Sequence, residues 1–170
     1  GRAMPSGNAV EALCARFIAL GLAEDGRHGH LRFDPALARY LSGQLDPNAR
    51  AAWLERWRNG MEHFLAELYQ QYFKDGGRAK RLLRLELPNL LALLRDIQQR
   101  VPTERTARIA SQLEQLLASL GSAAALAEAA AARERAGQAL LGWSQARFET
   151  ERLRIERLRD KGALEEALQT

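Results

Sequence analysis

Apolar side chains recur every three or four positions along most of the chain, which is the spacing of helices with one buried face. The longest such pattern follows Asp46 and Pro47, a capping residue and a residue suited to a first helical turn, and closes at Gly76-Gly77. We expect its apolar members to form one stripe that is buried in the core. The alternative is that this stripe binds a partner helix. These members are Trp53, Trp57, Met61, Phe64, Leu65, Leu68 and Tyr72.

A shorter helix is predicted ahead of this one. Asn8 followed by Glu11 has the spacing of a capping box, and Gly21 is suited to end the helix in a left-handed conformation. The apolar positions between them are Val10, Leu13, Cys14, Phe17 and Ile18.

The segment after Gly21 is the one place where the pattern predicts β-structure. Two short extended pieces, Leu22–Glu24 and His30–Phe33, flank an Asp25-Gly26 turn signal. Asp34 then caps a helix that has Pro35 in its first turn. Its expected apolar face consists of Leu37, Tyr40 and Leu41. An isolated hairpin is marginal in water, so we expect it to pack on helices.

Helical patterns continue to the end of the chain. A helix over 78–86 is expected to turn four leucines inward, and Pro88 either kinks it or begins a fresh helix that continues to Ile97. Those leucines are Leu82, Leu83, Leu85 and Leu87. Thr103 caps the next helix, Gly121 ends it, and Ser122 opens an alanine-rich helix that extends to Leu141.

A charged helix follows a turn at Trp143-Ser144 and runs to about Lys161, where Gly162 breaks it. Gly121 and Gly162 lie about 41 residues apart, and each separates a long helix from one that starts with small residues. This offset is longer than a 34-residue tetratricopeptide period and nearer to other α-solenoid units. The alanines over 123–132 would let neighbouring helices approach closely, as stacking in such arrays requires.

Composition supports an all-α protein. The 170 residues are 46% hydrophobic and 27% charged, and the abundant residues are helix formers. Cys14 is the only cysteine, which excludes an intrachain disulfide and fits a reducing, cytoplasmic compartment. No apolar run reaches the roughly 18 residues needed to cross a bilayer, so we expect no membrane partner. Residues 1–7 have the character of a tag remnant or flexible lead-in.

The sequence offers little catalytic chemistry. His28 and His30 flank Gly29 at the hairpin tip, but no further ligand stands at convincing spacing, and His63 is isolated. The chain has no phosphate-binding loop of the Walker type. We therefore expect no catalytic, cofactor or metal site, and hence no enzyme activity.

Two stretches carry a resemblance to a known family. The run from Leu20 through Leu41, with the hairpin and its Asp34-Pro35 cap, resembles the tail of a winged-helix domain in the STAND class of signalling NTPases, of the apoptotic and bacterial-regulator type. The run over 85–94 resembles the Glu-x-x-Asn-Leu helix that follows the winged helix in bacterial members, before tetratricopeptide-like repeats. The matches cover about the first 100 residues.

The resemblance implies a domain plan. Residues 8–46 would be the C-terminal part of a winged-helix-like unit, and residues 47–170 a tetratricopeptide-like helical array truncated at its C-terminus. The family has a nucleotide-sensing His where this chain has Asp34. An ionised carboxylate repels phosphate, so we interpret Asp34 as a helix N-cap rather than a nucleotide sensor.

The resemblance also implies a function. The chain would be a non-enzymatic interaction scaffold of a larger signalling NTPase or regulator, coupling a protein or peptide partner to an upstream NTPase domain. Phe33, Asp34 and Pro35 would form the coupling hairpin. The candidate partner contacts are Trp143, Arg147, Phe148 and Arg154. Self-association is left open.

Two alternatives remain at this point. The net charge of +4 and the basic run of Arg78, Lys80, Arg81 and Arg84 raise nucleic acid as a partner, and with it a DNA-binding regulator fragment. Acidic residues interspersed in the C-terminal helices argue against nucleic acid. A regulatory or assembly domain of an enzyme is the second alternative.

Overall fold

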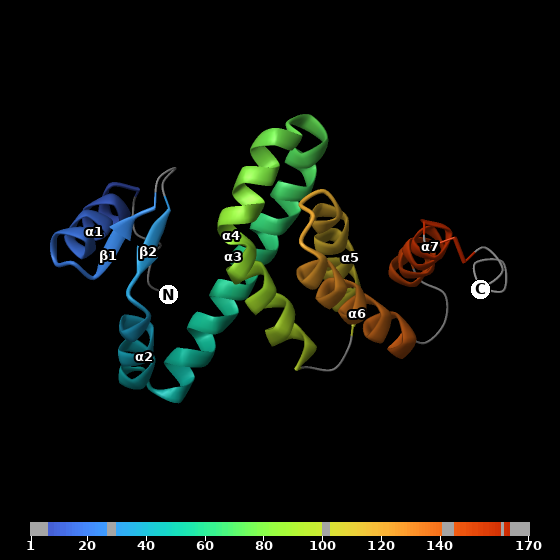
Figure 1. Cartoon of the computed structure of the whole chain (residues 1–170). Coiled ribbons are helices and arrows are strands. Elements are labelled where there is room, and N and C mark those ends of the chain that lie inside the picture. The colour runs from blue at the N-terminus through green and yellow to red at the C-terminus, as the bar shows by residue number, and fades with distance from the viewer. Residues whose placement is uncertain (1–6, 27–29, 100–102, 141–144, 161, 164–170) are drawn as a thin grey trace. The chain divides into compact units, whose positions relative to one another are not determined.

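The computed structural model describes residues 7–26, 30–99, 103–140, 145–160 and 162–163. Within them it has seven helices and one hairpin, which confirms the all-α class (Figure 1). The elements are α1 (Gly7–Ala19), β1 (Ala23–Asp25), β2 (Leu31–Phe33), α2 (Pro35–Gln44), α3 (Pro47–Lys74), α4 (Gly76–Gln98), α5 (Glu104–Ala118), α6 (Ala123–Ala139) and α7 (Gln145–Asp160). Contacts divide the chain into two units, Gly1–Arg56 and Trp57–Thr170, and the division falls within α3.

The first unit contains the predicted hairpin. β1 and β2 are antiparallel, with Ala23 opposite Phe33 and Asp25 opposite Leu31. Gly21 ends α1 with a φ of +68°, a left-handed conformation that favours glycine. Phe33 packs edge-on against Phe17 of α1, with ring centroids 5.4 Å apart. The hairpin therefore rests on α1, as an otherwise marginal ribbon must.

The first unit has little core of its own. Among its described residues Ala23 is the only buried hydrophobic side chain, at 5% exposure, and α1 buries none of its residues. Helices α1 and α2 form as predicted, but the side chains of their predicted apolar faces are largely exposed to solvent. Their exposed members are Val10, Leu13, Ile18, Tyr40 and Leu41. Burial on this scale leaves the unit dependent on contacts beyond itself for a hydrophobic driving force.

Three of the predicted helix caps are confirmed. Asp34 accepts the backbone N–H of Ala36 at 2.7 Å, and the Asp46 carboxylate accepts two backbone N–H groups at 2.9 and 3.0 Å. Thr103 accepts the backbone N–H of Thr106 at 3.3 Å. Each cap satisfies N–H groups that have no partner inside the helix.

The second unit begins with an antiparallel pair formed by α3 and α4. Arg58 near the start of this part of α3 is paired with Asp96 near the end of α4, which sets the two helices in opposite directions. Between them lies the main core, which α5 and α6 also enter. Its fully buried members include Leu65, Leu83, Leu90, Leu93, Leu94, Leu113, Leu116 and Leu117.

The structure corrects the prediction for Gly76-Gly77 and excludes one of the two alternatives for Pro88. Gly76-Gly77 forms the first turn of α4 rather than a loop, because Asp75 caps the helix directly by accepting the Arg78 N–H at 2.9 Å. Pro88 does not begin a fresh helix, since α4 runs continuously through it. Pro88 and Arg84, whose carbonyl loses its helical donor, are both exposed, so water can satisfy that carbonyl while buried leucines on the other face hold the helix.

Two residues expected in the core are outside it. Trp53 is 56% exposed, and it precedes the point in α3 at which the second unit and its core begin. Leu85 is 40% exposed because it lies on the outer side of α4, two positions beyond the inward-facing Leu83 and so on the opposite face of the helix.

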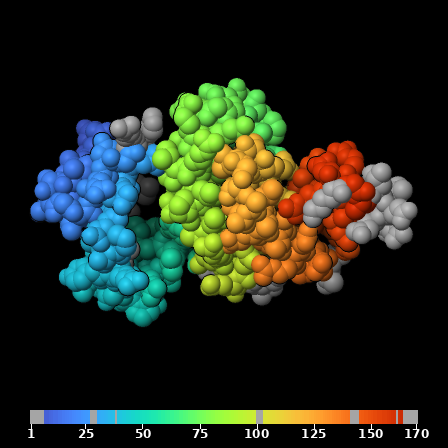
Figure 2. Space-filling model, in the orientation of Figure 1, coloured from blue at the N-terminus to red at the C-terminus, as the bar shows by residue number. Residues whose placement is uncertain are grey.

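The remaining helices alternate in direction. Arg105 of α5 contacts Glu62 of α3 at 2.8 Å, and Tyr69 and Gln115 meet further along, so α3 and α5 are parallel. Arg95 of α4 contacts Glu128 of α6 at 2.6 Å. Arg135 of α6 contacts Gln98 of α4, so these two helices are also parallel. Figure 2 shows α4, α5 and α6 packed into one continuous surface.

The predicted correspondence of two glycines has a structural counterpart. Gly121 follows α5 with a φ of +72°, and Gly162 follows α7 with a φ of +76°. At Gly162 the chain turns in a Schellman-type pattern, because the Ala163 N–H donates to Leu158 O at 2.9 Å. The helix predicted after Gly162 and the turn at Trp143-Ser144 lie outside the described residues.

Close approach of α6 and α7 depends on Gly137. A Cβ added there would lie 2.4 Å from Cγ2 of Thr150, far inside contact distance. The Thr150 hydroxyl donates back to Ala146 O at 2.9 Å, which fixes the side chain against α6. The missing Cβ therefore sets how near α7 can lie to α6.

We predict that Gly137→Ala destabilises the second unit by about 1–3 kcal/mol, because the new methyl group overpacks the α6–α7 contact. Thr150→Ser removes Cγ2 and should recover part of that loss in the double variant. Gly60→Ala is the matched control, since nothing lies within 4 Å of its added Cβ in helix α3, and it should be neutral or stabilising by up to about 1 kcal/mol. Urea denaturation, followed by circular dichroism, gives the free energy of unfolding of the unmodified chain, the two glycine variants and the double variant. Equal effects of the two glycine substitutions would contradict the close approach.

Candidate functional site

A groove opens between α3, α5 and α7 in the second unit, with α6 contributing at its base. Its cavity volume is about 370 Å³. The lining residues come from four helices: Tyr69, Tyr72 and Phe73 of α3, Glu114, Gln115 and Ala118 of α5, Leu126 of α6, and Leu153, Glu156, Arg157 and Asp160 of α7. We call this feature the aromatic groove.

Three rings form the α3 wall of the aromatic groove. Phe73 meets Tyr69 and Tyr72 edge-on, with ring centroids 5.2 and 5.6 Å apart. The two tyrosines are half-buried, whereas Phe73 is 67% exposed. Edge-to-face contacts hold a ring in a defined orientation. Phe73 therefore presents a large apolar surface to solvent from a supported position.

Tyr69 connects the wall to the next helix. Its hydroxyl donates to Oε1 of Gln115 at 2.5 Å. Burial raises the pKa of Tyr69 above its usual value, Glu149 raises it further, and Arg152 acts in the opposite direction. Tyr69 is therefore neutral at physiological pH and serves the groove as a hydrogen-bonding aromatic side chain.

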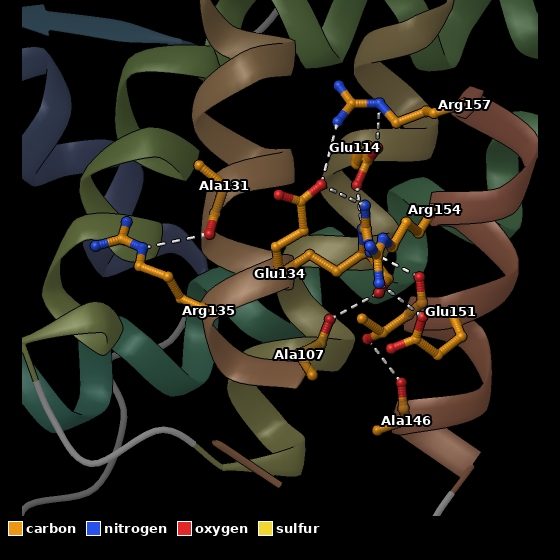
Figure 3. Close-up of polar contacts among 12 residues, drawn as sticks. Ala107, Glu114, Ala131, Glu134, Arg135, Ala146, Glu151, Arg154 and Arg157 are labelled. Carbon is orange, nitrogen blue, oxygen red and sulfur yellow. Dashed lines mark hydrogen bonds and ion pairs between the residues drawn. The ribbon is translucent and has the colours of Figure 1, made fainter. Parts of the chain in front are cut away.

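An ionic cluster with two buried and two partly exposed members underlies the α5 side of the groove. It consists of Glu114 from α5, Arg133 and Glu134 from α6, and Arg157 from α7, and Figure 3 shows Glu114, Glu134 and Arg157 converging from their helices. Oε1 of Glu114 lies 3.0 Å from Nε of Arg157, and its Oε2 accepts from Nε of Arg133 at 2.6 Å. One carboxylate thus joins three helices.

Arg133 is fully buried, at 0% exposure, and its charge is matched by surrounding acceptors. Besides Glu114, it donates from Nη1 to the carbonyl oxygen of Thr150 at 2.7 Å and reaches Glu134 from Nη2 at 3.4 Å. A planar guanidinium can bind several acceptors on different helices at once, because its N–H donors point in fixed and different directions. The cluster holds α7, which buries only Ala146, Thr150 and Leu153, against α5 and α6.

A second, smaller groove lies on the other side of Arg157. Its volume is about 180 Å³, and its lining is mostly polar. The lining residues are Glu134, Gln138, Thr150, Glu151, Arg154, Arg157 and Leu158. Arg157 lines both grooves, so the second groove is bordered by the same ionic cluster.

The predicted partner contacts on α7 lie apart from the aromatic groove. Phe148 is 55% exposed and lines neither groove. Nη1 of Arg147 donates to Leu140 O at 3.3 Å. Arg154 lines the second groove and lies 3.6 Å from Glu151 (Figure 3). Trp143 lies outside the described residues.

The predicted coupling residues lie together in the first unit. Phe33, Asp34 and Pro35 border a shallow groove of about 140 Å³ beside the hairpin. The Asp34 carboxylate is engaged as the cap of α2, which agrees with its interpretation as an N-cap. Of the two hairpin-tip histidines, His28 lies outside the described residues.

Sequence analysis missed the residues that form the aromatic groove's exposed wall and buried cluster. Phe73 falls one position off the Leu68–Tyr72 stripe, so periodicity assigns it no neighbour. Glu114 is a charged residue among leucines, and Arg133 is a charged residue among alanines, on faces that the pattern makes buried. A buried charge needs a partner of opposite charge, so a charged residue on an apolar helix face indicates a buried ion pair. That signal was available in the sequence.

The buried polar groups beside the aromatic groove are engaged with one another. Glu114 is shared by two guanidinium groups, and Tyr69 is held neutral. Among the described residues no three His, Cys, Asp or Glu side chains are grouped to hold a metal ion. No helix in that part of the chain is long and apolar enough to cross a membrane. Comparisons with family models, curated proteins and solved structures found no match.

We predict that Arg133→Met lowers the free energy of unfolding by about 3–5 kcal/mol, because Glu114 keeps its burial but loses its closest counter-ion. Arg154→Met is the matched control, since this arginine is half exposed and only weakly paired with Glu151, and it should change stability by at most about 1 kcal/mol. Urea denaturation of both variants makes the comparison. Similar losses in the two variants would mean that the cluster does not hold α7 in place.

Proposed function

We propose that the chain is a non-enzymatic interaction scaffold and that a protein or peptide segment binds in the aromatic groove. The observation that carries the proposal is Phe73, a supported ring that is 67% exposed at the edge of a groove lined by apolar side chains from four helices. Large aromatic side chains in such positions supply much of the binding energy at protein interfaces. Exposing one to water has no stabilising role in the free protein.

The charges around the groove indicate the chemistry of the partner. Glu156 and Asp160 of α7 line the groove. Among the described residues each is paired only with an exposed arginine of its own helix, Arg152 at 3.4 Å and Arg159 at 3.6 Å. Such exposed pairs are weak and exchange readily. A segment with a bulky apolar anchor next to Lys or Arg would bury the anchor and meet these carboxylates.

The second unit supports an array as the scaffold. Helices α3 and α5 are parallel, α4 and α6 are parallel to each other, and α3 and α4 are antiparallel, so consecutive helices alternate in direction. Left-handed glycines end α5 and α7 about 41 residues apart. Repeated helical pairs of this kind are consistent with a tetratricopeptide-like or related solenoid unit, which the sequence resemblance also implies.

The same resemblance suggests how binding would be used. A segment bound in the groove contacts both α3 and α7. Binding therefore stabilises the distance between these two helices that allows both contacts. In a cytoplasmic STAND-type regulator that preference would be coupled to an upstream NTPase domain. The exposed apolar faces of α1 and α2 fit a unit that packs on further protein, as the end of a winged-helix domain would.

We predict that a displayed library of random 16-residue peptides, selected on the full chain, yields binders with a bulky apolar residue next to Lys or Arg. Phe73→Ala should weaken a selected peptide by about tenfold or more, as expected for an anchor residue. Trp53→Ala is the matched control, an exposed aromatic residue on the same helix α3 but outside the groove. Fluorescence anisotropy of the labelled peptide measures the affinities.

Two outcomes would overturn the groove as the binding site. One is a library that yields no binder under conditions in which the chain is folded. The other is binding that Phe148→Ala abolishes and Phe73→Ala leaves intact, which would move the contact to the other exposed ring, on α7. Replacing Glu156 and Asp160 by Gln and Asn should in addition remove the preference for a basic neighbour.

A further inference from the structure

The first half of α4 carries a surface that the aromatic groove does not use. Arg78, Lys80, Arg81 and Arg84 occupy one side of the helix, opposite the buried Ala79 and Leu83. We call these four residues the basic stripe. All three arginines are exposed, and Lys80 is half-buried. Lys74, the last residue of α3, adds a fifth cation at the adjoining turn.

The basic stripe is not neutralised by ion pairs in the part of the chain that the structure describes. Within the described residues none of its four side chains makes a hydrogen bond or an ion pair. The two carboxylates nearest in sequence are occupied elsewhere, since Asp75 caps α4 and Glu86 accepts from the Asn89 side chain at 2.7 Å. The stripe therefore carries an excess of positive charge, which the Asp75 carboxylate at the start of α4 offsets only in part.

Several other arginines of the second unit are paired with carboxylates. Arg58 is paired with Asp96, Arg95 with Glu128, and Arg105 with Glu62. Arg95 is the informative comparison because it lies on α4 itself, where Glu128 of α6 reaches it. On α4, the arginine that faces α6 is thus paired, whereas the four side chains of the stripe make no ion pair within the described residues.

The stripe is costly to the isolated protein. Arg78 and Arg81, Arg81 and Arg84, and Lys80 and Arg84 are separated by three or four residues, so like charges face one another along the helix. Cations in the first turns also oppose the helix dipole. An anionic partner would remove both penalties on binding.

Shape and composition favour an extended polyanion as that partner. Figure 1 shows the turn end of the α3–α4 pair projecting beyond α5 and α6. Arg78 and Arg84 lie about 9 Å apart along the helix axis, from the rise per residue. Over this length duplex nucleic acid presents several phosphates, and its major groove is about as wide as a helix with its side chains.

In the stretch Gly77–Pro88 the polar side chains other than Glu86 are all cations, the residue type that neutralises phosphates. Leu85 is its one large hydrophobic residue with marked exposure, which is little apolar surface for an acidic protein segment to bury. We infer that the basic stripe binds the phosphate backbone of duplex nucleic acid. This inference is independent of the aromatic groove.

Fluorescence anisotropy with a labelled 24-base-pair duplex of arbitrary sequence, titrated with the full chain between 50 and 200 mM KCl, tests the inference. We expect a dissociation constant on the order of micromolar at 50 mM salt. The logarithm of the association constant should fall with the logarithm of salt with a slope of about −3.6 to −4.5, for four to five phosphate contacts.

The double variant Arg81→Gln/Arg84→Gln should make that slope shallower by about 1.8, because two contacts are lost. Arg152→Gln/Arg159→Gln is the charge-matched control, since these exposed arginines of α7 are paired with Glu156 and Asp160, and its slope should equal that of the unmodified chain. Phe73→Ala should bind the duplex normally, which separates this site from the peptide groove. Circular dichroism verifies that each variant is folded.

Three results would overturn the inference. They are no binding to the duplex at 50 mM KCl, an equal slope change in the two double variants, and competition by poly-L-glutamate as effective as that by unlabelled duplex at equal charge concentration. The last result would assign the stripe to an acidic polypeptide instead.

Discussion

Arg133 is buried where α5, α6 and α7 meet, and its guanidinium is satisfied by the Glu114 carboxylate and the Thr150 carbonyl. The arrangement constrains all three helices at once, because a buried charge must keep its partners or lose several kcal/mol. Gly137 permits the short α6–α7 distance that the contact to Thr150 requires. The charged helix α7, with few apolar residues to bury, is thus fixed largely by directed polar contacts.

This constraint connects the core to both grooves. Glu114 and Arg157 belong to the ionic cluster and also line the aromatic groove, so the position of α7 determines the width of that groove. The exposed Phe73 and the unpaired cations of α4 are, by contrast, features that cost the free protein stability. Features of that kind are informative about partners because folding alone does not explain them.

Local signals predicted most element boundaries and failed where packing outweighed them. Asp34, Asp46 and Thr103 act as caps because a side-chain acceptor next to free N–H groups satisfies them in any tertiary context. Gly76, Gly77 and Pro88 are weak helix formers, yet α4 runs through all three because its opposite face is buried among leucines. The apolar pattern of α1 predicted its helix but not its exposure.

The sequence by itself determined the helical class, the hairpin and the apolar stripes, since these follow from periodicity, turn residues and caps within a few neighbouring positions. The basic run of α4 is also visible in the sequence. That its side chains make no ion pairs within the described residues is visible only in the structure. Only the tertiary structure brought Tyr69, Glu114 and Arg157 to one groove and matched Arg133 with its acceptors. These residues come from different helices, and their distances depend on how the helices pack, which no local pattern encodes.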